Sequence, residues 1–334
     1  MNLQHRINLL CELGKYILSG QPSWENAKRK AFANNSWFIP EFIDLASNHI
    51  ANAFLQKNNL ESWTNQYHLP AETPLPRNVG LVMAGNIPLV GFHDFLSVFI
   101  TGHKQTIRLS AKDNILLLHL VQQLASMEPE VNNIVSFGEM LKGCDAYIAT
   151  GSNNTSRYFD YYFGKYPHII RRNRTSVAVL EGNETKEQLE LLANDVYYYF
   201  GLGCRNVTKL FVPANYDFVP LLEAFRKFNY LAEYNKYKNN YDYQLALLIL
   251  NKKYYMTNES LILVENASPF SPISVLHFEY YKDIRQVTDS LKGNEDIQCV
   301  TGSNFIPFGQ AQKPPLTEYA DGVDTLEFLN SLYD

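Results

Sequence analysis

Apolar positions in the first part of the chain recur at the spacing of a helix. Ile7, Leu10 and Leu13 lie three residues apart. The same helical spacing returns at Phe42, Ile43, Ala46, Ile50 and Phe54. A proline followed by Ser23 and Glu25 is typical of a helix start. Residues 1–66 are therefore predicted to be helical and to cover a sheet.

From residue 76 the pattern changes to short apolar runs that alternate with longer helical stretches. Runs of strand length lie at residues 79–84, 105–110, 134–137 and 144–150. Helices are predicted through Phe99 and from Ala111 to Met127. Strands that alternate with helices indicate a parallel sheet with right-handed crossovers. The predicted fold class is therefore α/β.

A second α/β block follows. Its strands are predicted at residues 177–180, 261–264, 273–278 and 297–301, and its helices at residues 185–199, 218–228 and 281–291. Residues 229–240 are polar and rich in Tyr and Lys, which predicts a surface stretch. Residues 305–324 have little periodicity, and we read them as a tail.

Composition excludes several classes of protein. The 334 residues, 46% of them hydrophobic, are enough for two domains with cores of their own. Acidic residues outnumber basic ones, 34 to 29, which argues against a nucleic-acid binder. No apolar run reaches the roughly 18 residues of a membrane span. The four cysteines lack CxxC spacing, so we expect no metal site, no disulfide framework and a cytoplasmic location.

Residues 200–207 carry the strongest chemical signal. Cys204 follows two glycines and precedes Arg205, in a polar gap between an aromatic run and a strand-like run. Glycines let another molecule approach the main chain closely, and Arg205 with nearby N–H groups would favour the thiolate. Cys204 is therefore the leading nucleophile candidate. The alternative is a packed, inert cysteine, which is the commoner role of this residue.

Polar residues also stand where three of the first four predicted strands end. They are Asn86, Ser110 and the loop 151–155. Because ligands of parallel sheets bind beyond the carboxyl ends of the strands, we expect these residues near a ligand.

Four short motifs occur in an order that resembles the aldehyde dehydrogenase superfamily. They are Ala84-Gly85-Asn86-Ile87-Pro88, Ile107-Arg108-Leu109-Ser110-Ala111-Lys112, Ala149-Thr150-Gly151-Ser152 and Gly201-Leu202-Gly203-Cys204. The chain looks most like the acyl-CoA reductases related to the fatty-acid reductase subunit of bacterial bioluminescence. The similarity covers roughly residues 76 to 330.

The resemblance implies roles for residues in these motifs. Cys204 would be the nucleophile, and the Asn86 side chain would donate to the oxyanion, which lowers the barrier to acyl transfer. The second motif would hold the cofactor's adenosine ribose, and the third would face the pyrophosphate at a helix start. The implied cofactor residues are Arg108, Ser110, Lys112, Thr150, Gly151 and Ser152. The alternatives are a simple turn at Asn86 and an exposed basic strand end at Arg108.

Three departures from the family's pattern refine the predicted chemistry. The stretch 172–177, where the family has its general-base Glu, contains no carboxylate, and Ser268 stands where a Glu would bind the cofactor ribose, with Glu265 nearby. Hydrolysis of a thioester needs a base to activate water, whereas reduction by hydride does not. Ala111 replaces a Glu that would repel a 2′-phosphate, so Arg108 and Lys112 favour NADPH, with NADH as the alternative.

The proton donor is chosen among the histidines, because a ring with a pKa near neutrality could protonate the leaving aldehyde oxygen. The candidates are His93, His168 and His277, of which His168 is preferred.

The predicted architecture has two α/β domains with a cleft between them. Residues 1–174 would form N-terminal helices and an NAD(P)-binding domain, residues 175–303 a catalytic domain, and residues 304–334 a tail that returns to the cleft. The predicted activity is NADPH-dependent reduction of an acyl thioester, such as acyl-CoA, to the aldehyde through an acyl-Cys204 intermediate. One alternative is the same chemistry on an acyl phosphate or acyl-carrier thioester, and another is a non-catalytic nucleotide-binding relative. A homo-oligomer is a further expectation.

Overall fold

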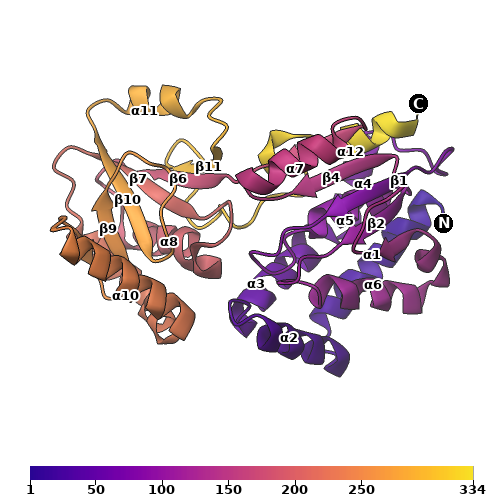
Figure 1. Ribbon diagram of the computed structural model, residues 1–334, viewed down its shortest axis with the longest axis horizontal. Helices are drawn as coiled ribbons and strands as arrows, with labels where there is room; N and C mark the ends of the chain where they lie inside the picture. Colours follow the sequence, from indigo (N-terminus) through magenta and orange to yellow (C-terminus); the bar gives the residue numbers. More distant parts are fainter. Residues whose placement is uncertain (334) are drawn as a thin grey trace. The chain divides into compact units, whose positions relative to one another are not determined.

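The computed structural model describes residues 1–333, together with their side chains except those of Asn153 and Asn154. The chain forms two compact units (Figure 1). Unit 1 contains residues 1–173 and 315–334, and unit 2 contains residues 174–314. The chain therefore leaves unit 1 once and returns to it near the end.

Unit 1 is built on a five-stranded parallel sheet with the order β3-β2-β1-β4-β5. The strands are β1 (Asn78–Val82), β2 (Lys104–Arg108), β3 (Val135–Phe137), β4 (Ala146–Thr150) and β5 (His168–Arg171). Chain order runs outward from β1 in one direction and then from β4 in the other. The sheet is thus doubly wound, and its topological switch point lies between β1 and β4.

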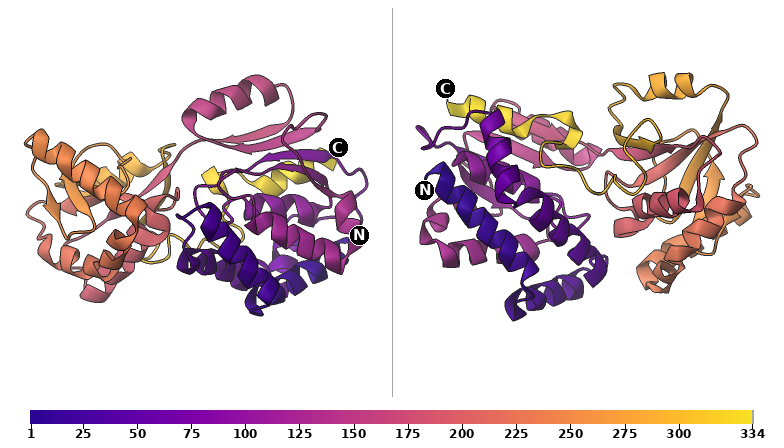
Figure 2. Two further views of the ribbon diagram at one scale, coloured as in Figure 1. Left: turned by 60° about the horizontal axis from the view of Figure 1, so that its bottom comes forward. Right: turned by 180° about the vertical axis from the view of Figure 1, so that it is seen from behind.

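Helices cover both faces of this sheet, with α7 on one face and α5 and α6 on the other (Figure 2). Their bounds are α5 (Phe92–Thr101), α6 (Leu116–Met127), α7 (Asn153–Phe163) and α12 (Thr325–Asn330). The first part of the chain is helical, as predicted, in α1 (Leu3–Leu18), α2 (Pro22–Asn34), α3 (Pro40–His49), η1 (Ile50–Phe54) and α4 (Lys57–Gln66). Shorter helical turns are η2 (Pro129–Asn133), η5 (Ala320–Gly322) and η6 (Ser331–Tyr333).

Helix α5 shows why unit 1 folds as it does. Phe92, Phe95 and Phe99 are almost fully buried, and successive rings lie 5.6 Å apart between centroids. The helix ends at Gly102, whose φ of +78° is a left-handed conformation that glycine adopts without steric cost. α12 packs against α5, so the returning segment completes this core.

Unit 2 has a six-stranded sheet with the order β11-β6-β7-β10-β9-β8, parallel except for the pairing of β8 with β9. The strands are β6 (Thr175–Val179), β7 (Val207–Pro213), β8 (Met256–Thr257), β9 (Ile262–Glu265), β10 (Val275–Tyr281) and β11 (Ile297–Gly302). The helices are α8 (Lys186–Tyr197), η3 (Tyr198–Gly201), α9 (Val219–Phe225), η4 (Arg226–Glu233), α10 (Asn235–Leu250) and α11 (Ile284–Leu291). The α/β fold class is confirmed.

Two details differ from the predicted elements. Helix α6 begins at Leu116 rather than at Ala111, because the side-chain amides of Asn34 and Asn35 bond the carbonyls of residues 111 and 112 and hold them in a turn. Residues 229–240 are largely helical, in η4 and α10. Tyr237 and Tyr241 lie one turn apart on α10, and their buried rings hold this polar segment against unit 2.

None of the helices in the described chain is long and apolar enough to cross a membrane.

Candidate functional site

The predicted residues of unit 1 lie at one edge of its sheet. β1 pairs in parallel with β2 and with β4, so the carboxyl ends of these three strands are neighbours. Asn86 lies in the loop after β1, Ser110 in the loop after β2, and Thr150 is the last residue of β4. The structure therefore places these three predicted residues beyond or at the same edge, around the switch point.

The loops after β1 and β2 are locked together. A side chain at Gly85 would approach the Ser110 Cβ and Oγ to 2.6 Å, so only glycine allows this contact. The buried carboxylate of Asp113 accepts a hydrogen bond from the Leu89 N–H at 2.7 Å. Leu89 itself has a φ of +56°, a left-handed conformation that a branched residue adopts at a steric cost. Asp113 thus holds a strained turn three residues beyond Asn86.

Burial raises the pKa of Asp113 to about 7, and the hydrogen bond from Leu89 opposes that rise. Its other oxygen, Oδ1, is buried with no hydrogen-bond partner among the described residues. The sequence motifs did not point to Asp113, although its polar side chain directly after the motif at residues 107–112 was the available signal.

The same edge offers groups that suit a dinucleotide. Arg108 and Lys112 are exposed, and neither forms an ion pair with a described residue. Ser152 caps α7 by accepting from the Thr155 N–H at 3.3 Å, so the N-terminus of an 11-residue helix begins at this edge. A side chain at Gly151 would meet the Phe159 ring at 2.9 Å, so the turn lies close against its helix. A helix N-terminus and two cations at the same sheet edge suit a polyphosphate.

Cys204 lies in unit 2, in a loop that begins with strained backbone. Tyr199, Phe200 and Gly201 have φ values of 55°, 56° and 73°, so three successive residues are left-handed. This conformation costs about 1–2 kcal/mol for each of the two aromatic residues. Both residues are at most 5% exposed, and the Phe200 ring packs against that of Tyr237 with centroids 5.5 Å apart. Core packing thus imposes the strain that sets the direction of the Cys204 loop.

Asn206 is the residue that fastens the loop. Its Oδ1 accepts from the Gly203 N–H at 2.8 Å. Its Nδ2 donates to three carbonyls at the end of α8, those of Asp195, Val196 and Tyr198, at 2.8–3.3 Å. Asn206 is fully buried, so each of these bonds replaces a bond to water. No sequence motif pointed to Asn206, although an Asn two residues after the candidate nucleophile was the available signal.

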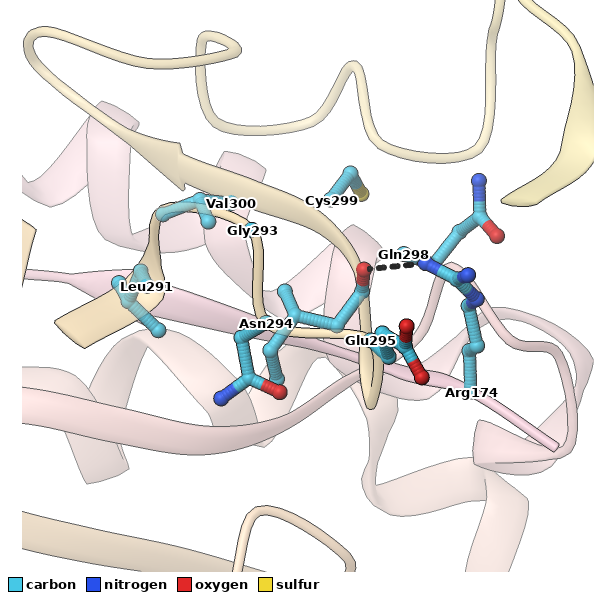
Figure 3. Close-up of a pocket in the computed structure, with 9 residues that line it drawn as sticks. Arg174, Leu291, Gly293, Asn294, Glu295, Gln298, Cys299 and Val300 are labelled. Carbon is cyan, nitrogen blue, oxygen red and sulfur yellow. Dashed lines mark hydrogen bonds between the residues drawn. The ribbon is translucent and has the colours of Figure 1, made fainter. Parts of the chain in front are cut away.

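Ser176 connects the Cys204 loop to a second cysteine. Its hydroxyl donates to the Cys204 carbonyl at 3.0 Å, accepts from the Cys299 N–H at 3.2 Å and lies 3.1 Å from the Cys299 sulfur. Cys299 lies on β11 in the wall of a pocket of about 370 Å³, whose other lining residues include Arg174 and Glu295 (Figure 3). Cys204 is not among the residues that line this pocket.

The other cysteines are poorer nucleophile candidates. Burial raises the pKa of the Cys11 thiol and that of the Cys144 thiol, which keeps both protonated at neutral pH. Cys299 is buried, whereas Cys204 is partly exposed. Within the described residues, no three His, Cys, Asp or Glu side chains come together as metal ligands.

The structure does not support His168 as the proton donor. His168 is the first residue of β5, pairs with Tyr147 near the start of β4, and bonds the Tyr166 carbonyl at 2.8 Å. It therefore lies at the amino-terminal edge of the unit 1 sheet, opposite the edge that carries Asn86. The local sequence around His168 does not reveal at which edge of the sheet this histidine lies.

His93 and His277, the other two candidates, each bond a main-chain carbonyl, those of Leu316 and Ser268, at 2.8 and 2.9 Å. Burial lowers the pKa of His277.

The loop at Ser268 is held by its main chain. Lys209 bonds the Ala267 carbonyl at 2.6 Å, and Thr208 bonds the Pro269 carbonyl at 2.6 Å. The Ser268 hydroxyl turns back to the Phe270 carbonyl at 3.0 Å. β7 thereby fixes the loop where the family's pattern has a ribose-binding Glu.

No protein-family model and no curated protein sequence matches the chain. Solved structures do. An NAD-dependent aldehyde dehydrogenase from Sinorhizobium meliloti is 12% identical with a TM-score of 0.67, over 94% of this chain and 73% of that one. Aldehyde dehydrogenase 21 from Physcomitrella patens, in complex with succinate, is 11% identical with a TM-score of 0.66, over 91% and 74%.

A third structure is succinic semialdehyde dehydrogenase from Streptococcus pyogenes in complex with NADP+, 13% identical with a TM-score of 0.64, over 93% of this chain and 79% of that one. At identities this low, the TM-scores of 0.64–0.67 show a shared fold and nothing beyond it. Together with the doubly wound sheet of unit 1 and the cysteine loop of unit 2, they show that the chain has the aldehyde dehydrogenase fold.

Proposed function

We propose that the protein is an oxidoreductase that reduces an acyl thioester to an aldehyde with NADPH, through an acyl-Cys204 intermediate. The observation that carries this proposal is the partly exposed Cys204 on a loop clamped by Asn206, in a chain with the aldehyde dehydrogenase fold. Fixing a nucleophile on strained, over-determined backbone keeps it oriented for attack.

The proposed roles follow from the chemistry of acyl transfer. The Cys204 thiolate attacks the thioester carbonyl, a new carbon–sulfur bond forms, and the CoA thiolate leaves. The Asn86 amide and the Cys204 N–H are the proposed donors to the oxyanion, because donors aimed at developing charge lower the barrier. Covalent capture divides one difficult exchange into two easier steps. Adding a hydride to the acyl carbon then breaks the bond to Cys204 and releases the aldehyde.

The residues around the cysteine loop favour reduction over hydrolysis. Residues 172–177 contain no carboxylate. Ser176, in this stretch, donates its hydroxyl to the Cys204 main chain rather than accepting a proton from water. Without a base to activate water, the acyl-Cys204 thioester would not be hydrolysed before a hydride is transferred to it. The same argument disfavours oxidation of an aldehyde to the free acid.

The proposed cofactor is NADPH, which when bound would supply the hydride. Arg108 and Lys112 would attract a 2′-phosphate, Ser110 would bond the ribose, and the turn Thr150-Gly151-Ser152 would face the pyrophosphate at the start of α7. Ala111 presents no carboxylate to repel the extra phosphate. Among the similar structures, one enzyme is described as NAD-dependent and another was solved with NADP+.

Mass spectrometry of the acylated protein tests the proposal. Mixing the protein with a long-chain acyl-CoA without cofactor should add one acyl mass to a peptide that contains Cys204, and NADPH should then remove it as aldehyde. Cys204→Ala should abolish both results, whereas Cys144→Ala should retain them. If an acyl phosphate labels Cys204 and acyl-CoA does not, the substrate is an activated carboxyl group other than a CoA thioester. Aldehyde formed without any adduct would exclude Cys204 as the nucleophile.

A further inference from the structure

Asp195 lies where several contacts of the Cys204 loop meet. It is fully buried in the last turn of α8. Its Oδ2 accepts from the Gly309 N–H at 2.6 Å and its Oδ1 from the Ala311 N–H at 3.1 Å. Hydrogen bonds to a charged acceptor are stronger than neutral ones. The carboxylate therefore fixes residues 309–311 onto α8.

The sequence of this segment suits the position. Gly309 has a φ of +80°, and a side chain there would approach the Leu191 Cδ2 to 2.9 Å. Ala311 is fully buried. The segment therefore lies closely against α8, with little room to move while Asp195 holds it.

From this segment the contacts run back to the cysteine loop. The Ala311 carbonyl accepts from the Arg205 guanidinium at 3.2 Å. The main-chain carbonyl of Asp195 accepts from the Asn206 side chain at 3.0 Å. The two residues that follow Cys204 are thus both tied to Asp195, one directly and one through Ala311.

We propose that Asp195 is a positioning residue for Cys204. Its carboxylate orders the segment 309–311. The Ala311 carbonyl of that segment in turn holds the guanidinium of Arg205, the residue that directly follows Cys204 in the sequence. The inference rests on the proposed function only in taking Cys204 as the nucleophile. Without the carboxylate, Arg205 would lose its fixed position and its influence on the thiol would fall.

Charged groups around Asp195 set the conditions for a pH test. They are Lys313, two residues beyond the segment, Arg205 on the cysteine loop, and Lys227, whose Nζ bonds the neighbouring Asn194 at 2.8 Å. Burial raises the pKa of Asp195 to about 7, opposed by the two N–H groups and by Lys313. As pH falls below 7 the carboxylate gains a proton, and its hold on residues 309–311 weakens.

The test is alkylation of Cys204 by iodoacetamide, without substrate or cofactor, followed on the Cys204 peptide by mass spectrometry. Asp195→Asn turns an NH₂ group towards one of the two N–H donors, so one hydrogen bond is lost. Alkylation at pH 7.5 should slow about tenfold, because a less favoured thiolate reacts more slowly. The pH at which the rate is half-maximal should also rise. Asp289→Asn, an exposed acid of the same unit, is the control and should change neither value.

A double variant separates positioning from general loosening. If Asp195 acts through Arg205, the variant Asp195→Asn with Arg205→Ala should react no more slowly than Arg205→Ala alone. If the two substitutions instead slow alkylation by factors that multiply in the double variant, their effects are independent. That result would overturn the proposed coupling of Asp195 to Arg205 through Ala311.

A measurement on the wild-type chain covers the case in which Asp195→Asn does not fold. The amide proton signals of Gly309 and Ala311 should shift together with one midpoint near pH 7. Amides that do not titrate, or a folded Asp195→Asn with an unchanged alkylation rate, would overturn the proposal. Since no acyl-CoA is present, these results stand apart from whether the protein reduces thioesters.

Discussion

Two buried carboxylates hold backbone near proposed catalytic residues. Asp113 in unit 1 holds the loop that carries Asn86, and Asp195 in unit 2 holds residues 309–311, whose Ala311 carbonyl bonds Arg205. In both, burial raises the pKa to about 7. At a pH between the two pKa values, such an acid is protonated in the folded chain and ionised in the unfolded chain. Between about pH 4 and pH 7, the contribution of these two acids to the free energy of unfolding therefore falls as pH rises, and it levels off above pH 7.

The direction of this pH dependence gives a prediction for Asp113→Asn. The asparagine side chain resembles the protonated aspartic acid and can still accept a hydrogen bond from the Leu89 N–H. The variant should be more stable than the wild type at pH 8, by about 4 kcal/mol at most, and the difference should vanish towards pH 4. All three tryptophans, at positions 24, 37 and 63, belong to unit 1, so their fluorescence in urea reports its unfolding. Asp160→Asn, an exposed acid of unit 1, should leave the pH dependence unchanged.

A second prediction at the residue scale concerns cofactor choice. Ala111→Glu adds a carboxylate next to Ser110, where it would repel a 2′-phosphate and bond a ribose hydroxyl. The dissociation constant for NADPH should rise about tenfold, while that for NADH stays the same or falls. Titration calorimetry with both cofactors measures this. Unchanged binding of both would show that this loop does not hold the ribose, and Ala111→Gln is the uncharged control.

At the scale of elements, the end of α10 offers a test of backbone strain. Lys252, two residues beyond the helix, has a φ of +50° and is exposed. Glycine adopts this conformation freely and commonly ends helices in this way. Lys252→Gly should stabilise unit 2 by up to about 1 kcal/mol. Lys253→Gly, whose φ is not positive, should be neutral or destabilising, and urea unfolding followed by circular dichroism distinguishes the two.

The elements also show what the sequence can and cannot predict. Continuous apolar runs such as residues 79–84 predicted buried parallel strands, because burial on both faces leaves no polar alternation. The helix at 235–250 was missed because its buried positions are tyrosines, whose neighbours are lysines and asparagines. The candidate site residues came from local motifs. Asn206, Asp113 and Asp195 could not, because their partners are defined by the folded loops or lie far along the chain.

At the scale of the whole molecule, unit 1 depends on residues that follow unit 2 in the sequence. Leu326 and Leu329 of α12 are fully buried, and Thr325 accepts from Arg171 of β5 at 2.8 Å. Tyr319 accepts from the indole N–H of Trp63 at 2.7 Å. The segment from residue 315 to residue 333 thus contributes buried side chains to the core of unit 1.

A chain that stops at Pro314 should therefore keep unit 2 and lose much of the stability of unit 1. Tryptophan fluorescence should report unfolding at a lower urea concentration, whereas the circular dichroism change of unit 2 should stay in place. Leu326→Ala in the full chain should reproduce the effect in part, at a cost of about 2–5 kcal/mol. A truncated chain with an unaltered fluorescence transition would mean that α12 adds little to this core.

The return of the chain to unit 1 also determines the order in which the two units can fold during translation. The strands of unit 1 leave the ribosome first, but α12 leaves only after every residue of unit 2 has been made. Domains generally fold as units while synthesis proceeds. Unit 2, continuous in sequence, can complete its core on the nascent chain, whereas α5 waits with an apolar face uncovered. Arresting translation soon after residue 314 would therefore give a polypeptide whose later part is folded and whose earlier part is a target for chaperones.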